Sequence, residues 1–205
     1  MKLFHYHHWT DQVEEMERFY TACGFRLTQR VGKANGVFSH FDPPLAWDDF
    51  REQRILFRII EVVLGSINVT FGFGKGTQFD HLGYLVNETE HAAICERAGH
   101  LGWETEIKDR RTFIYTPYSF KIELQRRMDV VDRDGDCEMT RVLMETAHDE
   151  IPLKLHELFG GLETGIRFVA GEKTRIQLVE GTSDRRFEAI DPCGVRLAFS
   201  AKGGE

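Results

Sequence analysis

Several sequence features of membrane, secreted and zinc-finger proteins are missing from this chain. The four cysteines are scattered among 205 residues without a Cys-x-x-Cys pair, which indicates neither a disulfide framework nor a zinc knuckle. No apolar run approaches the roughly 18 residues that a membrane span needs. The N-terminal residues also lack the pattern of a signal peptide. We therefore expect a soluble protein in a reducing cytoplasm.

Basic clusters are missing as well. The net charge is −7, and the longest basic runs are pairs such as Arg110-Arg111 and Arg126-Arg127. Nucleic acids and anionic membranes attract basic surfaces, so we expect neither as a partner. The apolar share of 41% and the charged share of 29% are ordinary for a globular protein with a core. A small-molecule substrate is the expected partner, and the sequence leaves a homodimer open.

One order of strand and helix patterns recurs three times. Residues 1–76, 77–127 and 138–202 each begin with a strand pattern, continue with a helix pattern and end with further strands. We therefore predict an α+β fold of repeated βαβββ modules that form mixed sheets. Residues 1–127 should hold two paired modules, and residues 138–205 should form a third, βαβββ-like module.

Capping signals mark the start of the first two helices. Asp11 and Glu14 have the spacing of a capping box, and Asn87 and Glu90 have the same spacing. The charged connector Asp129–Asp136 resembles a calcium loop only loosely, because it lacks the ligand spacing and the closing glutamate. We interpret it as a linker.

The segment Trp47–Leu64 is ambiguous. Its apolar residues recur at helical spacing, yet Ile55–Val63 also fits a buried strand. The periodicity count favours a helix, and Ile67–Phe73 would then be the closing strand of the first module. A helix would also move Glu61 away from that strand.

Two histidines occupy equivalent places in the first two modules. His5 lies six residues before Asp11 and His81 six residues before Asn87, each in the strand that opens its module. Glu123 lies in the strand that closes the second module. A lone histidine is more often an ordinary polar or core residue than a ligand. Three such residues at matching points of a repeat favour a metal site.

Other residues are weaker candidates. His7 shares the strand face of His5, because strand side chains alternate, and it is a candidate catalytic proton shuttle. Tyr115 is a weaker candidate for a pocket wall. His8 should point to the opposite face and is given no role. In the third module the positions equivalent to the ligands hold the apolar Leu143 and Ala198, so we expect that module to be structural.

Short motifs in residues 1–127 resemble the vicinal oxygen chelate superfamily, which includes glyoxalase I, extradiol ring-cleaving dioxygenases and the fosfomycin and bleomycin resistance proteins. The motifs are His5, Asp11, Phe19-Tyr20, Gly24-Phe25, Asp80-His81-Leu82-Gly83 and Lys121-Ile122-Glu123-Leu124. The resemblance implies a cupped sheet around a metal, with His5, His81 and Glu123 as ligands. An extra module in a short chain is similar to toxoflavin lyase.

The resemblance implies a metal-dependent enzyme for a small cyclic or vicinally oxygenated substrate. A 2-His-1-carboxylate set suits Fe(II), and Mn(II) is also compatible. Ring cleavage by a dioxygenase or a lyase is the first interpretation. An isomerase of the glyoxalase type would need a fourth ligand, for which Glu61 is the candidate. A metal-free protein that binds or sequesters a drug-like ligand is the third, and the 16 phenylalanines would suit its pocket.

Overall fold

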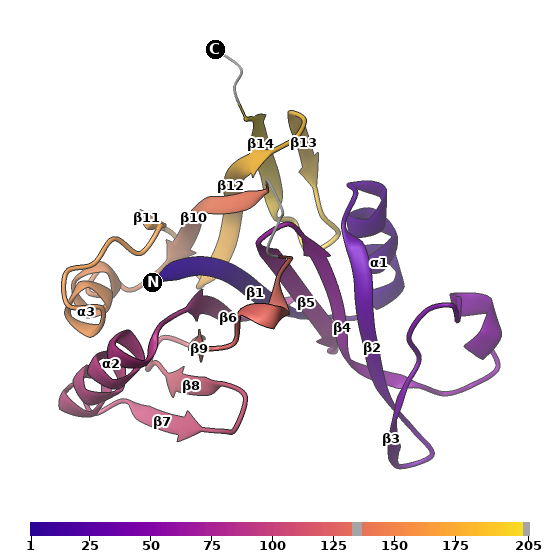
Figure 1. Cartoon of the computed structure of the whole chain (residues 1–205), viewed down its shortest axis with the longest axis horizontal. Coiled ribbons are helices and arrows are strands. Elements are labelled where there is room, and N and C mark those ends of the chain that lie inside the picture. The colour runs from indigo at the N-terminus through magenta and orange to yellow at the C-terminus, as the bar shows by residue number, and fades with distance from the viewer. Residues whose placement is uncertain (133–136, 203–205) are drawn as a thin grey trace.

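A computed structural model describes residues 1–132 and 137–202, so residues 133–136 of the predicted linker lie outside the described residues (Figure 1). The described chain forms two β-sheets, three α-helices and two short 3-10 helices. In chain order these are β1 (Lys2–Thr10), α1 (Val13–Ala22), β2 (Arg26–Ala34), β3 (Val37–His40), η1 (Trp47–Phe50), β4 (Leu56–Leu64), β5 (Ile67–Phe73), β6 (Gln78–Leu85), α2 (Glu88–His100), β7 (Glu104–Ile107), β8 (Thr112–Tyr115), β9 (Lys121–Gln125), η2 (Met128–Val130), β10 (Glu138–Thr146), α3 (Ile151–Leu158), β11 (Ile166–Ala170), β12 (Arg175–Ser183), β13 (Phe187–Ile190) and β14 (Arg196–Ala201).

The first sheet has nine strands in the order β3-β2-β4-β5-β1-β6-β9-β8-β7. Its two halves meet where β1 pairs antiparallel with β6. In each half the opening strand also pairs in parallel with the closing strand, β1 with β5 and β6 with β9. The predicted α+β fold with mixed sheets is confirmed. The arrangement puts the two opening strands, which carry the histidines, side by side in the middle of the sheet.

The helix predicted over Trp47–Leu64 is wrong. Only Trp47–Phe50 is helical, as a single 3-10 turn, and Leu56–Leu64 is the strand β4. This strand pairs with β2 on one side and β5 on the other. Its side chains Ile60, Val62 and Val63 are almost fully buried, because helix α1 covers one face of this part of the sheet. Arg58 and Glu61 are the only polar residues of β4 and lie three residues apart, so its apolar residues show no strict alternation and resemble a helical stripe.

One of the two predicted capping boxes is present. At the start of α2, Asn87 Oδ1 accepts a hydrogen bond from the backbone N–H of Glu90. The Glu90 carboxylate accepts one from the backbone N–H of Asn87. At the start of α1 the N-cap is Gln12, which has no side-chain cap. Asp11 is therefore not the cap, and the Glu14 carboxylate instead pairs with Arg51.

The second sheet has five strands in the order β11-β10-β12-β14-β13. Here the opening strand β10 pairs in parallel with β11, the strand that follows its helix, and antiparallel with β12. In the second module, by contrast, the opening strand pairs in parallel with the closing strand β9. The strand pairing of residues 138–201 thus differs from that of the second module.

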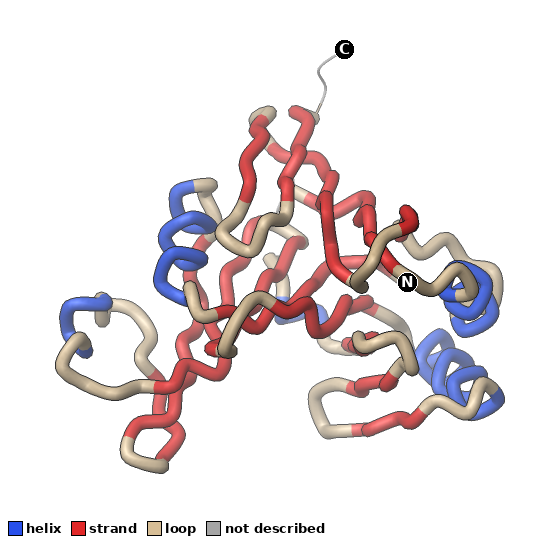
Figure 2. Tube along the Cα trace, turned by 180° about the vertical axis from the view of Figure 1, so that it is seen from behind, coloured by secondary structure: helices blue, strands red, loops and turns tan. Residues whose placement is uncertain are grey.

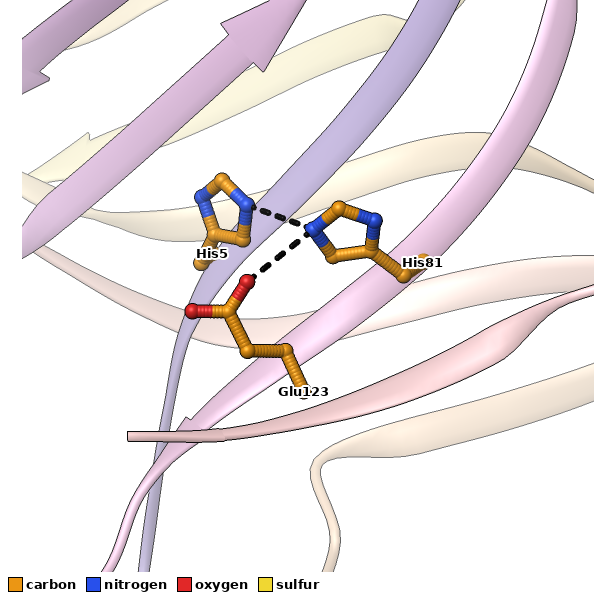
Figure 3. A group of neighbouring side chains, drawn as sticks. All are labelled: His5, His81 and Glu123. Carbon is orange, nitrogen blue, oxygen red and sulfur yellow. Dashed lines mark hydrogen bonds and ion pairs between the residues drawn. The ribbon is translucent and has the colours of Figure 1, made fainter. Parts of the chain in front are cut away.

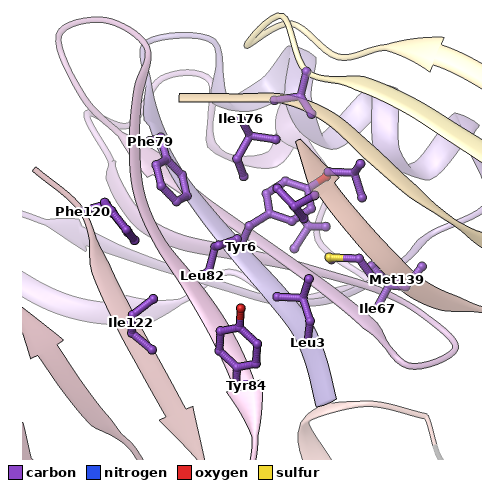
Figure 4. Packing of buried hydrophobic residues seen from close by; sticks show 14 of the residues in the cluster. Leu3, Tyr6, Ile67, Phe79, Leu82, Tyr84, Phe120, Ile122, Met139 and Ile176 are labelled. Carbon is purple, nitrogen blue, oxygen red and sulfur yellow. The ribbon is translucent and has the colours of Figure 1, made fainter. Parts of the chain in front are cut away.

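The two sheets share an apolar core. Leu3, Tyr6 and Ile67 of the first sheet lie in one cluster with Met139 and Ile176 of the second (Figure 4). A buried hydrogen-bond chain also joins them. The Tyr6 and Tyr20 hydroxyls are 2.6 Å apart, and Tyr20 donates to Asp191 Oδ2 at 2.8 Å.

The three α-helices lie at the periphery and the strands run through the middle of the molecule (Figure 2). Helices α2 and α3 contact each other, and the Arg97 side chain of α2 donates to the Leu158 carbonyl of α3 at 2.7 Å. None of the helices in the described ranges is long and apolar enough to cross a membrane.

Candidate metal centre

The three predicted ligands lie on three neighbouring strands. His5 is on β1, His81 on β6 and Glu123 on β9. Gly83 is the register partner of both His5 and Glu123, so it lies between them across the sheet. A Cβ atom at Gly83 would be 2.7 Å from His5 Cβ. The glycine of the Asp80-His81-Leu82-Gly83 motif therefore leaves the space that the His5 side chain needs.

The functional atoms of these residues converge (Figure 3). His5 Nε2 and His81 Nε2 are 3.0 Å apart, and His81 Nε2 is 3.2 Å from Glu123 Oε2. One potential ligand atom from each residue lies within 4.8 Å of the others, and all three side chains are buried. No other group of three or more His, Cys, Asp or Glu residues meets this criterion in the part of the chain that the structure describes.

Each histidine is oriented through its second ring nitrogen. His5 Nδ1 lies 2.8 Å from Asn68 Oδ1 and 3.0 Å from the Asn68 carbonyl. His81 Nδ1 lies 2.7 Å from Asp80 Oδ2. All three partners are acceptors, so Nδ1 of each ring carries a proton and Nε2 is left with a lone pair. Metal-binding histidines are typically oriented in this way by a carbonyl or carboxylate.

This donor set fits a divalent cation. With Nδ1 protonated in both rings, two Nε2 lone pairs and the Glu123 carboxylate face one point between them. A single proton on His81 Nε2 satisfies His5 and Glu123 only in part, whereas one cation can accept electron pairs from all three residues. Two imidazoles and one carboxylate form the donor set that suits Fe(II) with open coordination positions.

The electrostatics of the metal-free site are set by burial and by the carboxylates. Burial opposes the charge on His81, but its hydrogen bonds to Asp80 and Glu123 outweigh that effect and raise its pKa. Burial lowers the pKa of His5 to about 4, although the charge of Glu123 opposes the shift. Glu123 has its pKa lowered to about 2, because the hydrogen bond from His81 and nearby positive charges overcome its burial. In the metal-free site the dissociable proton therefore resides on His81.

Glu61 lies close to this centre but outside the three-residue group. Its carboxylate accepts hydrogen bonds from Thr28 Oγ1 at 2.6 Å and from Asn68 Nδ2 at 3.1 Å. Because Asn68 in turn holds His5, Glu61 orients the amide that orients the histidine. Sequence reasoning did not predict this role for Asn68, and nothing in the local sequence around it indicates such a role.

His7 lies on the same face of β1 as His5. Its ring stacks on His81, with centroids 5.0 Å apart and planes 4° apart, and its Nδ1 is 2.6 Å from Thr70 Oγ1. Its buried Nε2 has no hydrogen-bond partner among the described residues. Burial lowers the pKa of His7 well below its usual value, so the ring is neutral.

A cavity of about 420 Å³ opens beside the centre and is lined by His7 and His81. Its walls carry aromatic and charged residues that the sequence alone did not identify as a group: Trp9, Arg58, Glu61, Arg111, Phe113 and Lys121. Tyr115 is not among the lining residues; its side chain is exposed and its hydroxyl donates to Glu106 at 2.9 Å.

A second cavity of about 620 Å³ lies elsewhere, lined by His8, Cys193 and residues of β12, and it contains none of the three converging residues. His8 instead contacts the Tyr6 and Phe79 rings, as expected from its place on the other face of β1.

Comparison with known proteins gives matches of structure alone, since no protein-family model and no curated protein sequence matches the chain. The 2,2',3-trihydroxybiphenyl 1,2-dioxygenase of Sphingomonas wittichii RW1 is similar with a TM-score of 0.63 at 9% identity, over 98% of this chain and 90% of that one. The Mn(II)-bound glyoxalase of Novosphingobium aromaticivorans has a TM-score of 0.64 at 8% identity, over 100% and 83% of the two chains.

Homoprotocatechuate 2,3-dioxygenase of Arthrobacter globiformis has a TM-score of 0.60 at 12% identity, over 98% of this chain and 80% of that one. Identities this low establish the fold and leave the activity open. Extradiol dioxygenases and a glyoxalase are thus among the structural neighbours of the chain, as the sequence motifs implied. The protein has the fold of the vicinal oxygen chelate superfamily.

Proposed function

We propose that this protein is a metal-dependent enzyme that acts on a small ring compound with two adjacent oxygen atoms, by ring cleavage of the dioxygenase or lyase type. The observation that carries the proposal is the convergence of His5, His81 and Glu123 beside a cavity that also holds a neutral histidine. The likeness of the fold to ring-cleaving dioxygenases supports it.

His5, His81 and Glu123 would hold the metal, for which Fe(II) or Mn(II) suits the donors. A bound divalent ion supplies Lewis acidity and a template for two vicinal oxygens. Other residues of the chain orient the metal ligands. Asn68 and Asp80 keep the two Nε2 lone pairs directed at the centre.

His7 would accept the proton of a substrate hydroxyl. His7 Nδ1 lies 2.6 Å from the Thr70 hydroxyl, and in the tautomer that carries the proton on Nδ1 the acceptor is Nε2, next to His81. A neutral histidine with a free nitrogen at the cavity wall has the properties of a general base. Trp9 and Phe113 in the cavity walls would confine a planar ring. In this proposal residues 138–202 support the paired modules of residues 1–127 through the shared core.

An isomerase of the glyoxalase type is the second candidate. It is favoured by the position of Glu61, which lies on strand β4 and lines the same cavity. Its carboxylate is hydrogen-bonded to Asn68 and Thr28, so it would have to leave both partners to become a fourth ligand. The dioxygenase or lyase reaction needs no such rearrangement.

The test is metal content and turnover of three proteins. Wild-type protein reconstituted with Fe(II) or Mn(II) should bind about one ion and convert a catechol. His81→Ala should lose both properties and remain folded, whereas His100→Ala, which changes an exposed histidine of α2, should retain both. Full metal occupancy in His81→Ala would contradict the proposed site. A failure of wild-type protein to bind metal would favour the metal-free binding protein.

A further inference from the structure

The charge of the cavity beside the centre is opposite in sign to that of the whole chain. The chain has a net charge of −7. Three carboxylates line the cavity, namely Glu61, Asp80 and Asp129, against five cations: Arg58, Arg110, Arg111, Lys121 and Arg127. A cavity lined by one excess charge concentrates ligands of the other sign. This local reversal therefore favours an anionic ligand.

Three of the five cations are neutralised by neighbouring carboxylates. Lys121 Nζ lies 2.7 Å from Asp80 Oδ2, and Arg111 lies 3.4 Å from Glu123 Oε2. Arg127 pairs with Asp129. These contacts help to fix the walls of the cavity and the ligand residues themselves.

Arg58 and Arg110 differ from the other three. Neither forms an ion pair with a carboxylate of residues 1–132 or 137–202, the part of the chain that the structure describes. Both side chains are exposed to solvent at the cavity, Arg58 from β4 and Arg110 from the loop between β7 and β8. They therefore lie on different halves of the first sheet, and their donors are available to a ligand.

The aromatic walls are associated with the same cations. The Arg58 guanidinium lies over the Trp9 ring at 4.9 Å, and that of Arg111 lies over Phe113 at 5.2 Å. Lys121 Nζ is 5.5 Å from the Phe113 ring centre. A planar ring bound against these residues would have its edge close to a guanidinium, which binds a carboxylate through two parallel hydrogen bonds.

We propose that Arg58 and Arg110 form an anion subsite, so that the substrate is an aromatic compound with two adjacent oxygens on one side and a carboxylate on the other. This inference rests on the proposed function for the oxygen-bearing side of the substrate. The carboxylate side depends only on the two arginines and on the net charge of the cavity.

The test compares three probes by isothermal titration calorimetry on Mn(II)-loaded and metal-free protein. Catechol has the two oxygens only, phenylacetate has the carboxylate only, and 3,4-dihydroxyphenylacetate has both. At low salt the wild-type Mn(II) protein should bind 3,4-dihydroxyphenylacetate at least about tenfold more tightly than catechol. The ratio of the two affinities should fall at high salt, because salt screens exposed charges.

Variants test whether the two arginines cause the difference in affinity between 3,4-dihydroxyphenylacetate and catechol. In the double variant Arg58→Gln/Arg110→Gln the ratio should fall to near one. The control Arg186→Gln removes one exposed arginine that lies outside this cavity, and it should retain the wild-type ratio. Circular dichroism of each variant checks that it is folded.

The outcomes separate this inference from the proposed function. Metal-dependent catechol binding with equal affinities for catechol and 3,4-dihydroxyphenylacetate would overturn the anion subsite and leave the proposed function intact. Binding of phenylacetate to metal-free protein that is lost in the double variant would support the subsite even if catechol does not bind. A ratio unchanged in the double variant would also overturn the subsite.

Discussion

Gly83→Ala tests how closely the sheet is packed around the centre. Gly83 is buried on β6 and pairs with His5 and Glu123 in register. A Cβ at this position would lie 2.7 Å from His5 Cβ and 3.0 Å from Phe4 Cε1. His5 Cβ is attached directly to the backbone, so a rotamer change cannot relieve the overlap. The backbone of β1 or β6 must therefore shift, and a shift of β1 moves the His5 ring with it.

The expected cost has two parts. Overpacking of a buried site typically destabilises a protein by about 1–3 kcal/mol, and we expect the free energy of unfolding to fall by that amount. A displaced His5 ring would also lose its alignment with His81 and with Asn68. Loss of such orienting contacts typically weakens metal binding about 10–100-fold, and we expect at least tenfold.

The assay is urea denaturation together with metal titration in competition with a chromophoric chelator. Gly99→Ala is the matched control, because Gly99 is in helix α2 and a Cβ there meets no atom within 4 Å. That variant should be stabilised by about 0.5–1 kcal/mol, since alanine favours the helix, and its metal affinity should not change. Wild-type stability and wild-type metal affinity in Gly83→Ala would refute the reasoning.

Four further predictions concern the contacts of the centre and its dependence on pH. Asn68→Ala removes the side-chain oxygen that accepts the hydrogen bond of His5 Nδ1. Metal affinity should therefore fall about 10–100-fold in a chelator competition. An unchanged affinity would argue against the orienting role of Asn68. Thr70→Val removes the partner of His7 Nδ1, so turnover should fall about 10²-fold at retained metal content, and undiminished turnover would exclude Thr70 as the residue that orients His7. Metal and proton compete for His81 Nε2, and the pKa of His81 is raised above 6.5. Metal affinity should therefore fall as the pH drops through that raised pKa. A constant metal affinity in titrations over about pH 6–8 would contradict this expectation. The same raised pKa stabilises metal-free protein most fully below the unfolded value of 6.5, and chemical denaturation should show this contribution disappearing as pH rises through the folded pKa.

Local patterns in the sequence were sufficient for most elements. Ile67–Phe73 is a strand with the predicted bounds, because its apolar residues alternate with polar ones and glycine. The cap at Asn87 follows from side-chain chemistry within one helical turn. The local signal over Leu56–Leu64 fits both a helix and a strand. This segment is a strand because it pairs with β2 and β5.

The sequence by itself determined which residues could bind a metal, since His5, His81 and Glu123 occupy matching places in repeated units. Only the tertiary structure brought their ligand atoms within 4.8 Å, through the pairing of β1, β6 and β9. It also decided the contacts of Asn68 with His5 and the position of Arg58 and Arg110 at one cavity. The physical reason is that periodicity reports only which way a side chain points from its own strand or helix. Contacts between strands depend on register and packing, which join residues far apart in the chain.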